Sequence, residues 1–358
     1  MEPTSVLIVK NSMKKLKIIL IIIVMLAIAG AIFWFLGSRK VDVIGGNNNQ
    51  QEKPKNDIGI SPITGQECEN YNRRPIAVMM ANDAINRPLS GISQADVIIE
   101  MPVITGGITR LMAIFGCETP EEIGSVRSAR HDYVPLALGF NAIYAHWGGS
   151  HFAYDYLNKG IIDNIDAMID QYQIYYRTAD KEPPYNGFTS LERLINGAEK
   201  FKYSLENNFS GYPHLKKSGS NLQSPNTGGK LTIGYGGEFR VSYAYNKEEN
   251  IYQRYRTNLR EIDKNNGNQV EVAVVAVMRA ESHMIEEPNY NEVNVQGEGE
   301  AKIYQNGEEI KGTWKKKGNY TDSKLTFYNE NGKEIEFTPG KIWIEIVEPN
   351  TEVKWEVF

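Results

Sequence analysis

Short apolar runs alternate with polar turns through the first half of the chain beyond residue 60. The runs that predict buried strands, because strands covered on both faces are apolar at nearly every position, span 76–80, 97–101, 109–115 and 142–145. Helices are predicted at 132–138, at 152–157 and from Thr189 to about Lys200. The last begins with capping-box spacing between Thr189 and Glu192. Strands that alternate with helices favour a layered α/β arrangement.

Strands dominate the second half. A Ser-, Asn- and Gly-rich connector at 218–229 precedes them, and Asn306-Gly307 and Asn331-Gly332 predict turns between them. The predicted strands span 239–245, 251–256, 270–278, 301–304, 325–328 and 342–347, the first two as a hairpin. We therefore predict an α+β fold, with an N-terminal mixed α/β layered domain at 61–217 and a smaller β-rich C-terminal domain at 230–358.

One stretch near the N-terminus, Ile18–Gly37, carries no charge. As a helix its length is roughly 30 Å, the hydrocarbon thickness of a bilayer. More basic residues precede it than follow it, which places the N-terminus in the cytoplasm. We predict a cytoplasmic stub at 1–17, a single-pass membrane anchor at 18–37 and a disordered polar linker at 38–60, with the bulk of the chain extracytoplasmic. A cleaved signal peptide and a start at Met13 are the alternatives.

The composition of the chain limits the classes of partner and cofactor that we expect. The 358 residues are 41% hydrophobic and 23% charged, with a net charge of −5, which argues against a nucleic-acid partner. Cys68 and Cys117 could pair outside the cell, or could be free or buried. Their spacing fits no metal motif, and the chain has no phosphate loop or dinucleotide fingerprint, so we predict no metal and no cofactor.

Candidate ligand chemistry gathers in three polar islands, at 106–110, 124–130 and 146–150. Arg110, Arg127 and Arg130 are the best candidates, because guanidinium groups bind carboxylates and phosphates in bidentate fashion. Arg127 and Arg130 would share a face if their segment were helical. The alternative is that the three arginines pair with carboxylates of the chain, namely Glu100, Asp96 or Asp132. The further candidate ligand residues are Gly106, Gly107, Thr109, Ser128, His146, Ser150 and Asn186.

His146 follows a predicted strand and precedes a glycine turn. It could act as a general acid or base with Glu100 or Asp96, or it could be a hydrogen-bonded core histidine. The turn does not form a nucleophile elbow, because Phe152 stands where the last glycine is required. We therefore name no catalytic residue.

The ordered motifs resemble the YerB-like family of bacterial extracytoplasmic proteins, a domain of unknown function with a C-terminal companion domain. The motifs that carry this resemblance lie at 61–65, 74–79, 87–96, 106–110, 124–130, 146–150, 306–316, 332–335 and 339–344. The resemblance implies a two-part structure, and many relatives are lipoproteins, whereas this chain's anchor lacks the lipid-accepting cysteine. The family tends to carry a histidine where this chain has Tyr185, so histidine-dependent chemistry at that loop is not carried over.

These patterns support three hypotheses about function. The first is a membrane-anchored extracytoplasmic binding protein of a Gram-positive-type bacterium that holds an anionic cell-envelope ligand or a partner protein. The second is an envelope hydrolase or transferase that uses His146 with a carboxylate. The third is a structural adaptor, through the C-terminal half, for another membrane protein.

Overall fold

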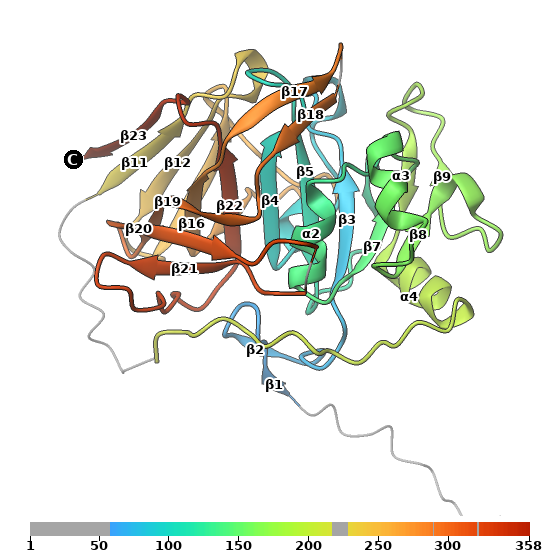
Figure 1. Ribbon diagram of the computed structural model, residues 1–358. Helices are drawn as coiled ribbons and strands as arrows, with labels where there is room; N and C mark the ends of the chain where they lie inside the picture. The colour runs from blue at the N-terminus through green and yellow to red at the C-terminus, as the bar shows by residue number, and fades with distance from the viewer. Residues whose placement is uncertain (1–57, 217–227, 289, 321) are drawn as a thin grey trace, which may run out of the picture. The chain divides into compact units, whose positions relative to one another are not determined.

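A ten-stranded mixed sheet passes through both halves of the chain in the computed structural model, which describes residues 58–216, 228–288, 290–320 and 322–358 (Figure 1). Its strand order is β21-β20-β19-β16-β22-β4-β5-β3-β7-β8. The strands are β3 (Ile76–Met80), β4 (Val97–Pro102), β5 (Thr109–Phe115), β7 (Ile143–His146), β8 (Asn164–Asp166), β16 (Val274–Arg279), β19 (Gly297–Gln305), β20 (Glu308–Lys316), β21 (Thr326–Asn329) and β22 (Ile342–Val347).

The two halves of the chain meet in the middle of this sheet. Strand β22 of the second half pairs in parallel with β4 of the first half, with Glu345 opposite Glu100. Residues from 57 onward form one compact unit. The predicted division into domains at 61–217 and 230–358 is therefore not confirmed as a structural division.

A second, six-stranded sheet belongs to the C-terminal half alone. The predicted hairpin is confirmed, since β12 and β13 pair along their whole length. The strands of this sheet are β11 (Gly229–Ile233), β12 (Val241–Asn246), β13 (Ile251–Arg256), β14 (Leu259–Arg260), β15 (Glu271–Val272) and β23 (Val353–Val357). The smaller sheets contain β1 (Gly59–Ile60) with β2 (Glu67–Cys68), β6 (Ile123–Gly124) with β9 (Tyr176–Arg177) and β10 (Gly187–Thr189), and β17 (Ser282–Glu286) with β18 (Tyr290–Val293).

The large sheet is buried on both faces, which explains its continuous apolar runs. In β3, Ala77 and Met79 join one hydrophobic cluster, whereas Ile76, Val78 and Met80 join the other. Helices α2 (Tyr133–Gly139) and α3 (His151–Leu157) cover the first face; α4 (Leu191–Lys200) and the six-stranded sheet cover the second. Short 3-10 helices lie at Ala84–Asn86, Ile92–Gln94, Ala167–Ile169 and Gly237–Phe239.

The capping residue of α4 differs from the prediction by one position. The Ser190 hydroxyl, rather than that of Thr189, accepts the hydrogen bond from the Arg193 backbone N–H, at 3.2 Å. Thr189 instead donates its hydroxyl proton to the carbonyl of Ile174 at 2.9 Å. The helix itself is confirmed.

The described residues are richer in strand than the predicted α+β fold, with 23 strands against three α-helices. Strand β1 begins at Gly59, so the ordered unit starts before the predicted end of the linker at residue 60. No helix in the described ranges is both long and apolar enough to cross a bilayer. The predicted anchor at 18–37 and most of the predicted linker and connector lie outside those ranges.

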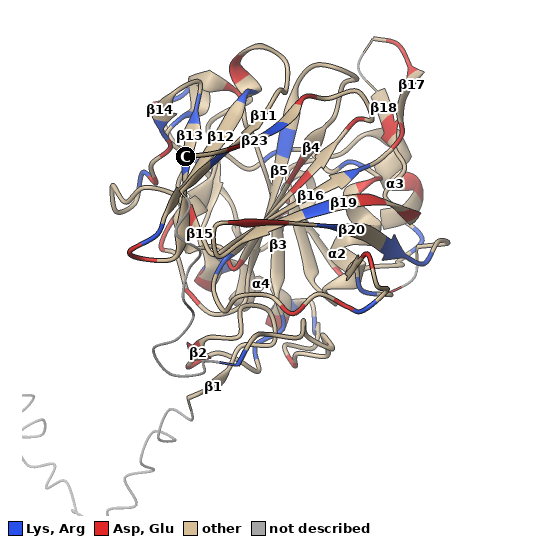
Figure 2. Cartoon of the chain, turned by 90° about the vertical axis from the view of Figure 1, so that its left-hand side faces the viewer, with Lys and Arg blue, Asp and Glu red and all other residues tan. Residues whose placement is uncertain are grey.

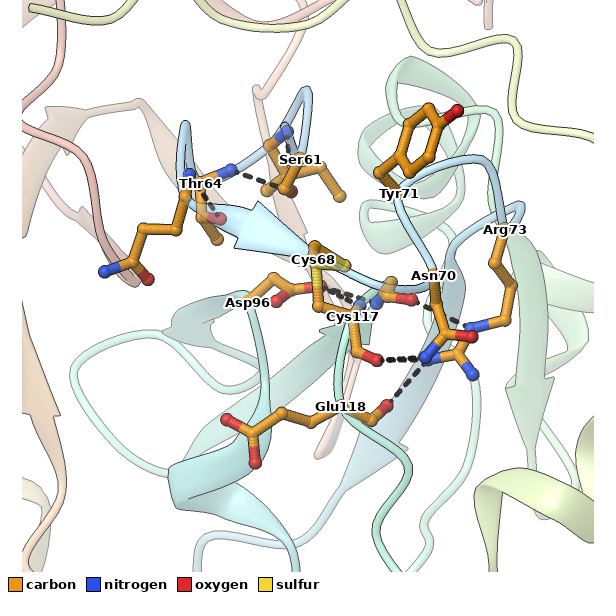
Figure 3. Close-up of a disulfide and its surroundings, with 12 residues drawn as sticks. Ser61, Thr64, Cys68, Asn70, Tyr71, Arg73, Asp96, Cys117 and Glu118 are labelled. Carbon is orange, nitrogen blue, oxygen red and sulfur yellow. Dashed lines mark hydrogen bonds between the residues drawn. A yellow bond between two sulfur atoms is a disulfide. The ribbon is translucent and has the colours of Figure 1, made fainter. Parts of the chain in front are cut away.

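Cys68 and Cys117 form a disulfide (Figure 3). The bond joins β2 to the residues that follow β5, across a sequence separation of 49. Asp96 accepts hydrogen bonds from the backbone N–H groups of Gly116 and Cys117, at 2.6 and 2.9 Å. Arg73 donates to the carbonyls of Gly116 and Cys117, at 2.8 and 2.9 Å. The disulfide therefore lies in a hydrogen-bonded junction at the edge where β3 begins.

Candidate functional site

The polar islands lie at one edge of the large sheet. Strands β3 and β7 are parallel, and both β3 and β4 are antiparallel to the β5 strand between them, so β3, β4 and β7 point the same way. The end of each of these strands, and the start of β5, therefore lie at a common edge, called here the carboxyl edge. Ligands of open α/β sheets commonly bind outside this edge.

Residues 125–130 cross the carboxyl edge in an extended conformation. The backbone N–H of Arg127 donates to the carbonyl of Met79 at 2.9 Å, and the carbonyl of Arg127 accepts from Trp147 at 3.0 Å. Further along, the N–H of Ala129 donates to the carbonyl of Gly148 at 2.8 Å. The helical arrangement considered for Arg127 and Arg130 is therefore wrong, because these backbone groups bond to β3 and to the residues that follow β7 instead.

Arg110, Arg127 and Arg130 are brought together and are called here the arginine cluster. Arg110, at the start of β5, donates to the carbonyl of Ser128 at 2.9 Å. Its side chain is buried, whereas Arg127 and Arg130 are half-buried. Burial, and then the charges of Arg130 and Arg127, lower the pKa of Arg110 well below its ordinary value. The three positive charges are therefore close enough to repel one another.

The arginine cluster has no acidic partner among the described residues. No carboxylate oxygen there lies within the 4.0 Å ion-pair distance of its guanidinium nitrogens. The predicted alternative of pairing with Glu100, Asp96 or Asp132 is therefore wrong. Glu100 binds two other arginines, Asp96 accepts backbone N–H groups, and Asp132 lies 3.2 Å from the imidazole of His131.

Aromatic rings border two of the three guanidiniums. The Arg127 guanidinium lies 5.0 Å from the ring centre of Tyr185, and that of Arg130 lies 5.7 Å from the ring centre of Tyr290. Tyr290 belongs to the β17–β18 hairpin, which also contacts α3 through ring contacts between Tyr290 and both His151 and Phe152. Both halves of the chain therefore contribute to the site, and sequence reasoning missed Tyr290 because it carries no motif.

Four other predicted ligand residues have structural roles. Thr109 is buried and donates to Glu100 at 2.7 Å, and Ser150 caps α3 by accepting from Ala153 at 3.1 Å. Asn186 accepts from Arg177 at 2.6 Å. Ser128 contributes its backbone carbonyl to Arg110. Ser128 therefore contributes to the arginine cluster through its backbone, not through its hydroxyl.

Gly106 and Gly107 lie in the β4–β5 loop and line a separate cavity. This cavity has a volume of about 710 Å³, and Tyr235, Glu281 and Glu348 are among its other lining residues. The backbone N–H of Gly106 donates to Glu348 at 3.0 Å. The three arginines are not among the lining residues, so the expected juxtaposition of these glycines with the arginines is not observed.

His146 is a buried histidine at the end of β7. Its side chain has no exposed surface, and its ring nitrogens lie 2.9 Å from the Gly148 carbonyl and 3.3 Å from Asn164 Oδ1. Burial lowers its pKa, and the neighbouring carboxylate of Asp166, 3.7 Å away, opposes that shift. The expected pairing with Glu100 or Asp96 is wrong, because those carboxylates are bonded elsewhere. The described residues contain no group of His, Cys, Asp or Glu that could hold a metal ion.

A buried ionic network, missed by sequence reasoning, joins the two sheets behind this edge. Arg256 binds Glu100 through two nitrogens, at 2.9 and 2.8 Å, and Arg254 lies 2.5 Å from Glu100 and 3.4 Å from Glu345. Arg254 also contacts Glu261 and lies 3.7 Å from the ring centre of Trp343. Elsewhere in the part of the chain that the structure describes, acidic and basic residues are interspersed (Figure 2).

Replacing Glu345 by glutamine is expected to change the pH dependence of stability. Burial, and then the charge of Glu100, raise the pKa of Glu345 to about 7, above the roughly 4.3 of an unfolded chain. Between these two pKa values the folded state therefore binds more protons than the unfolded chain. The wild type consequently loses stability as the pH rises from about 5 to 8. The Glu345→Gln variant lacks this loss. The melting temperature of the variant, relative to that of the wild type, should therefore rise as the pH increases from about 5 to 8. Plots of melting temperature against pH that run parallel for the variant and the wild type would contradict this assignment. So would the same relative rise in the exposed control Glu248→Gln.

The comparisons with known proteins agree with the fold and the motifs. Residues 63–204 match the model "Protein of unknown function (DUF3048) N-terminal domain", and residues 231–344 match its C-terminal counterpart. The chain is 31% identical over 293 residues to "Putative lipoprotein YerB" of Bacillus subtilis (strain 168), covering 80% of this chain and 86% of the relative. The crystal structure of the YerB protein from Bacillus subtilis superposes with a TM-score of 0.73 at 29% identity, covering 82% of this chain and 99% of that one. The chain therefore belongs to the YerB-like family of proteins that carry the two DUF3048 domains.

Proposed function

We propose that the protein is a membrane-tethered extracytoplasmic binding protein that holds an anionic ligand of the cell envelope at Arg110, Arg127 and Arg130. The observation that carries this proposal is the absence of an acidic partner for the cluster among the described residues. Grouping three guanidiniums raises the electrostatic free energy of the folded protein, and a bound anion would offset that cost.

The proposed location of the protein, tethered to the outer face of a membrane, is supported by separate observations. The relative is named a lipoprotein, which supports a membrane-associated extracytoplasmic place for this chain. The uncharged segment 18–37, which lacks a lipid-accepting cysteine, supports a single-pass helix as the tether instead. The described chain enters at β1, near the start of β3, whereas the arginine cluster lies at the opposite, carboxyl edge (Figure 1).

The enzyme hypothesis is less well supported. A general acid or base must reach the substrate, and the His146 side chain has no exposed surface in this structure. The adaptor hypothesis requires a continuous apolar patch on the C-terminal half. Its exposed large apolar residues lie on several elements and at the chain end, at Leu259, Ile262, Met284, Val357 and Phe358.

Replacing Arg127 by alanine is expected to weaken anion binding roughly tenfold or more, because a charge-assisted hydrogen bond contributes about 1.5–3 kcal/mol. The test is a calorimetric titration of the full-length protein, in a non-ionic detergent, with sulfate at low ionic strength. Arg240→Ala is the matched control, since it removes an arginine that is half exposed and paired with Glu352. No detectable binding, or equal affinities for the wild type and Arg127→Ala, would overturn the proposal.

A further inference from the structure

We infer that the arginine cluster selects a tetrahedral dianion, in particular the phosphate monoester group, over singly charged carboxylates and phosphodiesters. This inference rests on the proposed function and names the ligand class of the same site. It follows from the charge and the free donors of the three guanidiniums, and from the tyrosines beside two of them.

The charge of the site favours two negative charges on the ligand. Arg110 has no carboxylate within ion-pair distance, and neither do Arg127 and Arg130, in the part of the chain that the structure describes. The carboxylate of Asp83 acts on Arg110 from beyond ion-pair distance, so the cluster keeps an excess of positive charge, which a carboxylate or a phosphodiester would neutralise only in part. A phosphate monoester carries about −1.5 to −2 at pH 7 and therefore neutralises nearly two.

The hydrogen-bond donors of the site also exceed what a carboxylate can accept. A guanidinium has five N–H donors. Among the described residues, Arg110 donates one hydrogen bond, to Ser128, at 2.9 Å. Arg127 donates one long bond, of 3.4 Å, to Pro184, and Arg130 donates one of 3.1 Å to Ala129. Three phosphate oxygens can accept from several of the remaining donors at once.

Two further groups define the shape of the site. The guanidiniums of Arg127 and Arg130 lie over the rings of Tyr185 and Tyr290, which therefore bound the site beside them. The buried side chain of Tyr144 lies beside the cluster, since the backbone of Arg130 and the charges of Arg110 and Arg130 all act on its hydroxyl.

The pH dependence of binding distinguishes protonation of the ligand from protonation of the protein. The second proton of a phosphate monoester dissociates with a pKa of about 6, so preference for the monoester should fall below that pH. On the protein side, burial lowers the pKa of His131 to about 4, which keeps it neutral above pH 5. Burial raises the pKa values of Tyr133, Tyr144 and Asp132. The remaining ionisable side chains that face the cluster are Asp83, Tyr185 and Tyr290. Sulfate, a dianion throughout this range, reports any contribution from the protein.

The experiment titrates the full-length protein with monomethyl phosphate, dimethyl phosphate, acetate and sulfate at pH 8 and at pH 5. At pH 8 we expect monomethyl phosphate to bind about tenfold more tightly, or better, than dimethyl phosphate and acetate. At pH 5 this advantage should largely disappear, whereas the affinity for sulfate should change little between pH 8 and pH 5. Arg130→Ala should reduce the monoester preference, and Arg240→Ala should leave it unchanged.

Two outcomes overturn different statements. If dimethyl phosphate or acetate binds as tightly as the monoester at pH 8, with Arg130→Ala weakening all of them, the site binds anions without selecting dianions, and this inference is wrong. If none of the four anions binds, or if Arg130→Ala changes no affinity, the proposed function itself is wrong.

Discussion

Replacing Arg254 by methionine should lower the free energy of unfolding by about 3–5 kcal/mol, because the change leaves buried carboxylates without their cation. The Arg254 side chain has no exposed surface, and neither do the side chains of Glu100 and Glu345, which it contacts. Glu100 comes from the first half of the chain, whereas Arg254 and Glu345 come from the second. The contact therefore joins the two halves of the chain. Its loss should appear in urea denaturation as a lower free energy of unfolding.

The matched control is Arg240→Met. Arg240 pairs with Glu352, but the two side chains are 51% and 53% exposed, and exposed ion pairs contribute about 0–1 kcal/mol. A partial rescue is expected when Glu345→Gln is added to Arg254→Met, since this removes one of the carboxylates left unpaired. Equal and small losses in Arg254→Met and Arg240→Met would show that the buried network does not hold the sheets together.

Removing the disulfide by the paired change Cys68→Ser and Cys117→Ser should cost about 2–4 kcal/mol of stability, because the bond closes a loop and restricts the unfolded chain. The bond also ties β2 to the residues that follow β5, next to the hydrogen bonds that Arg73 donates and Asp96 accepts (Figure 3). The measurement is thermal unfolding with and without dithiothreitol.

The reductant provides the control for this prediction. The sequence contains two cysteines, so the double variant should not respond to dithiothreitol, and the reduced wild type should unfold near the temperature of the variant. A wild type that is insensitive to full reduction would contradict a stabilising role for the bond.

The apolar strands were predictable because burial on both faces leaves a continuous signal. The predicted strands at 76–80, 109–115, 251–256 and 342–347 have these bounds in the structure. Strand β20 was missed because most of its residues alternate between exposed and half-buried positions and carry many charges. Strand β23 was missed for the same reason. Neither strand has the hydrophobic pattern that identifies a core element.

The pairing of distant strands could not be predicted from local patterns. The contact between β22 and β4 joins residues about 245 positions apart, with Glu345 opposite Glu100. The arginines of β13 show the consequence most clearly. In this alternating strand, Tyr252, Arg254 and Arg256 are the buried positions, whereas a binary pattern would turn arginines toward solvent. The carboxylates supplied by β4, β22 and Glu261, which sequence patterns do not place beside them, make their burial tolerable.

The candidate site was predictable in part. The grouping of arginines with glycines in the sequence drew attention to Arg110, Arg127 and Arg130, and the fold brings these three together. Their extended setting across β3 and β7, and the tyrosines that border them, depend on tertiary structure. Gly106 and Gly107 were grouped with them because they lie close in sequence, but the β4–β5 loop carries both into a different cavity.

The most direct test of the account is a crystal structure of the protein soaked with tungstate, a tetrahedral dianion whose anomalous scattering identifies it without ambiguity. We predict an anomalous peak within hydrogen-bond distance of the guanidiniums of Arg127 and Arg130, and its loss in crystals of Arg130→Ala. A well-occupied peak elsewhere with none at the arginine cluster would contradict the assignment of this edge as an anion-binding site.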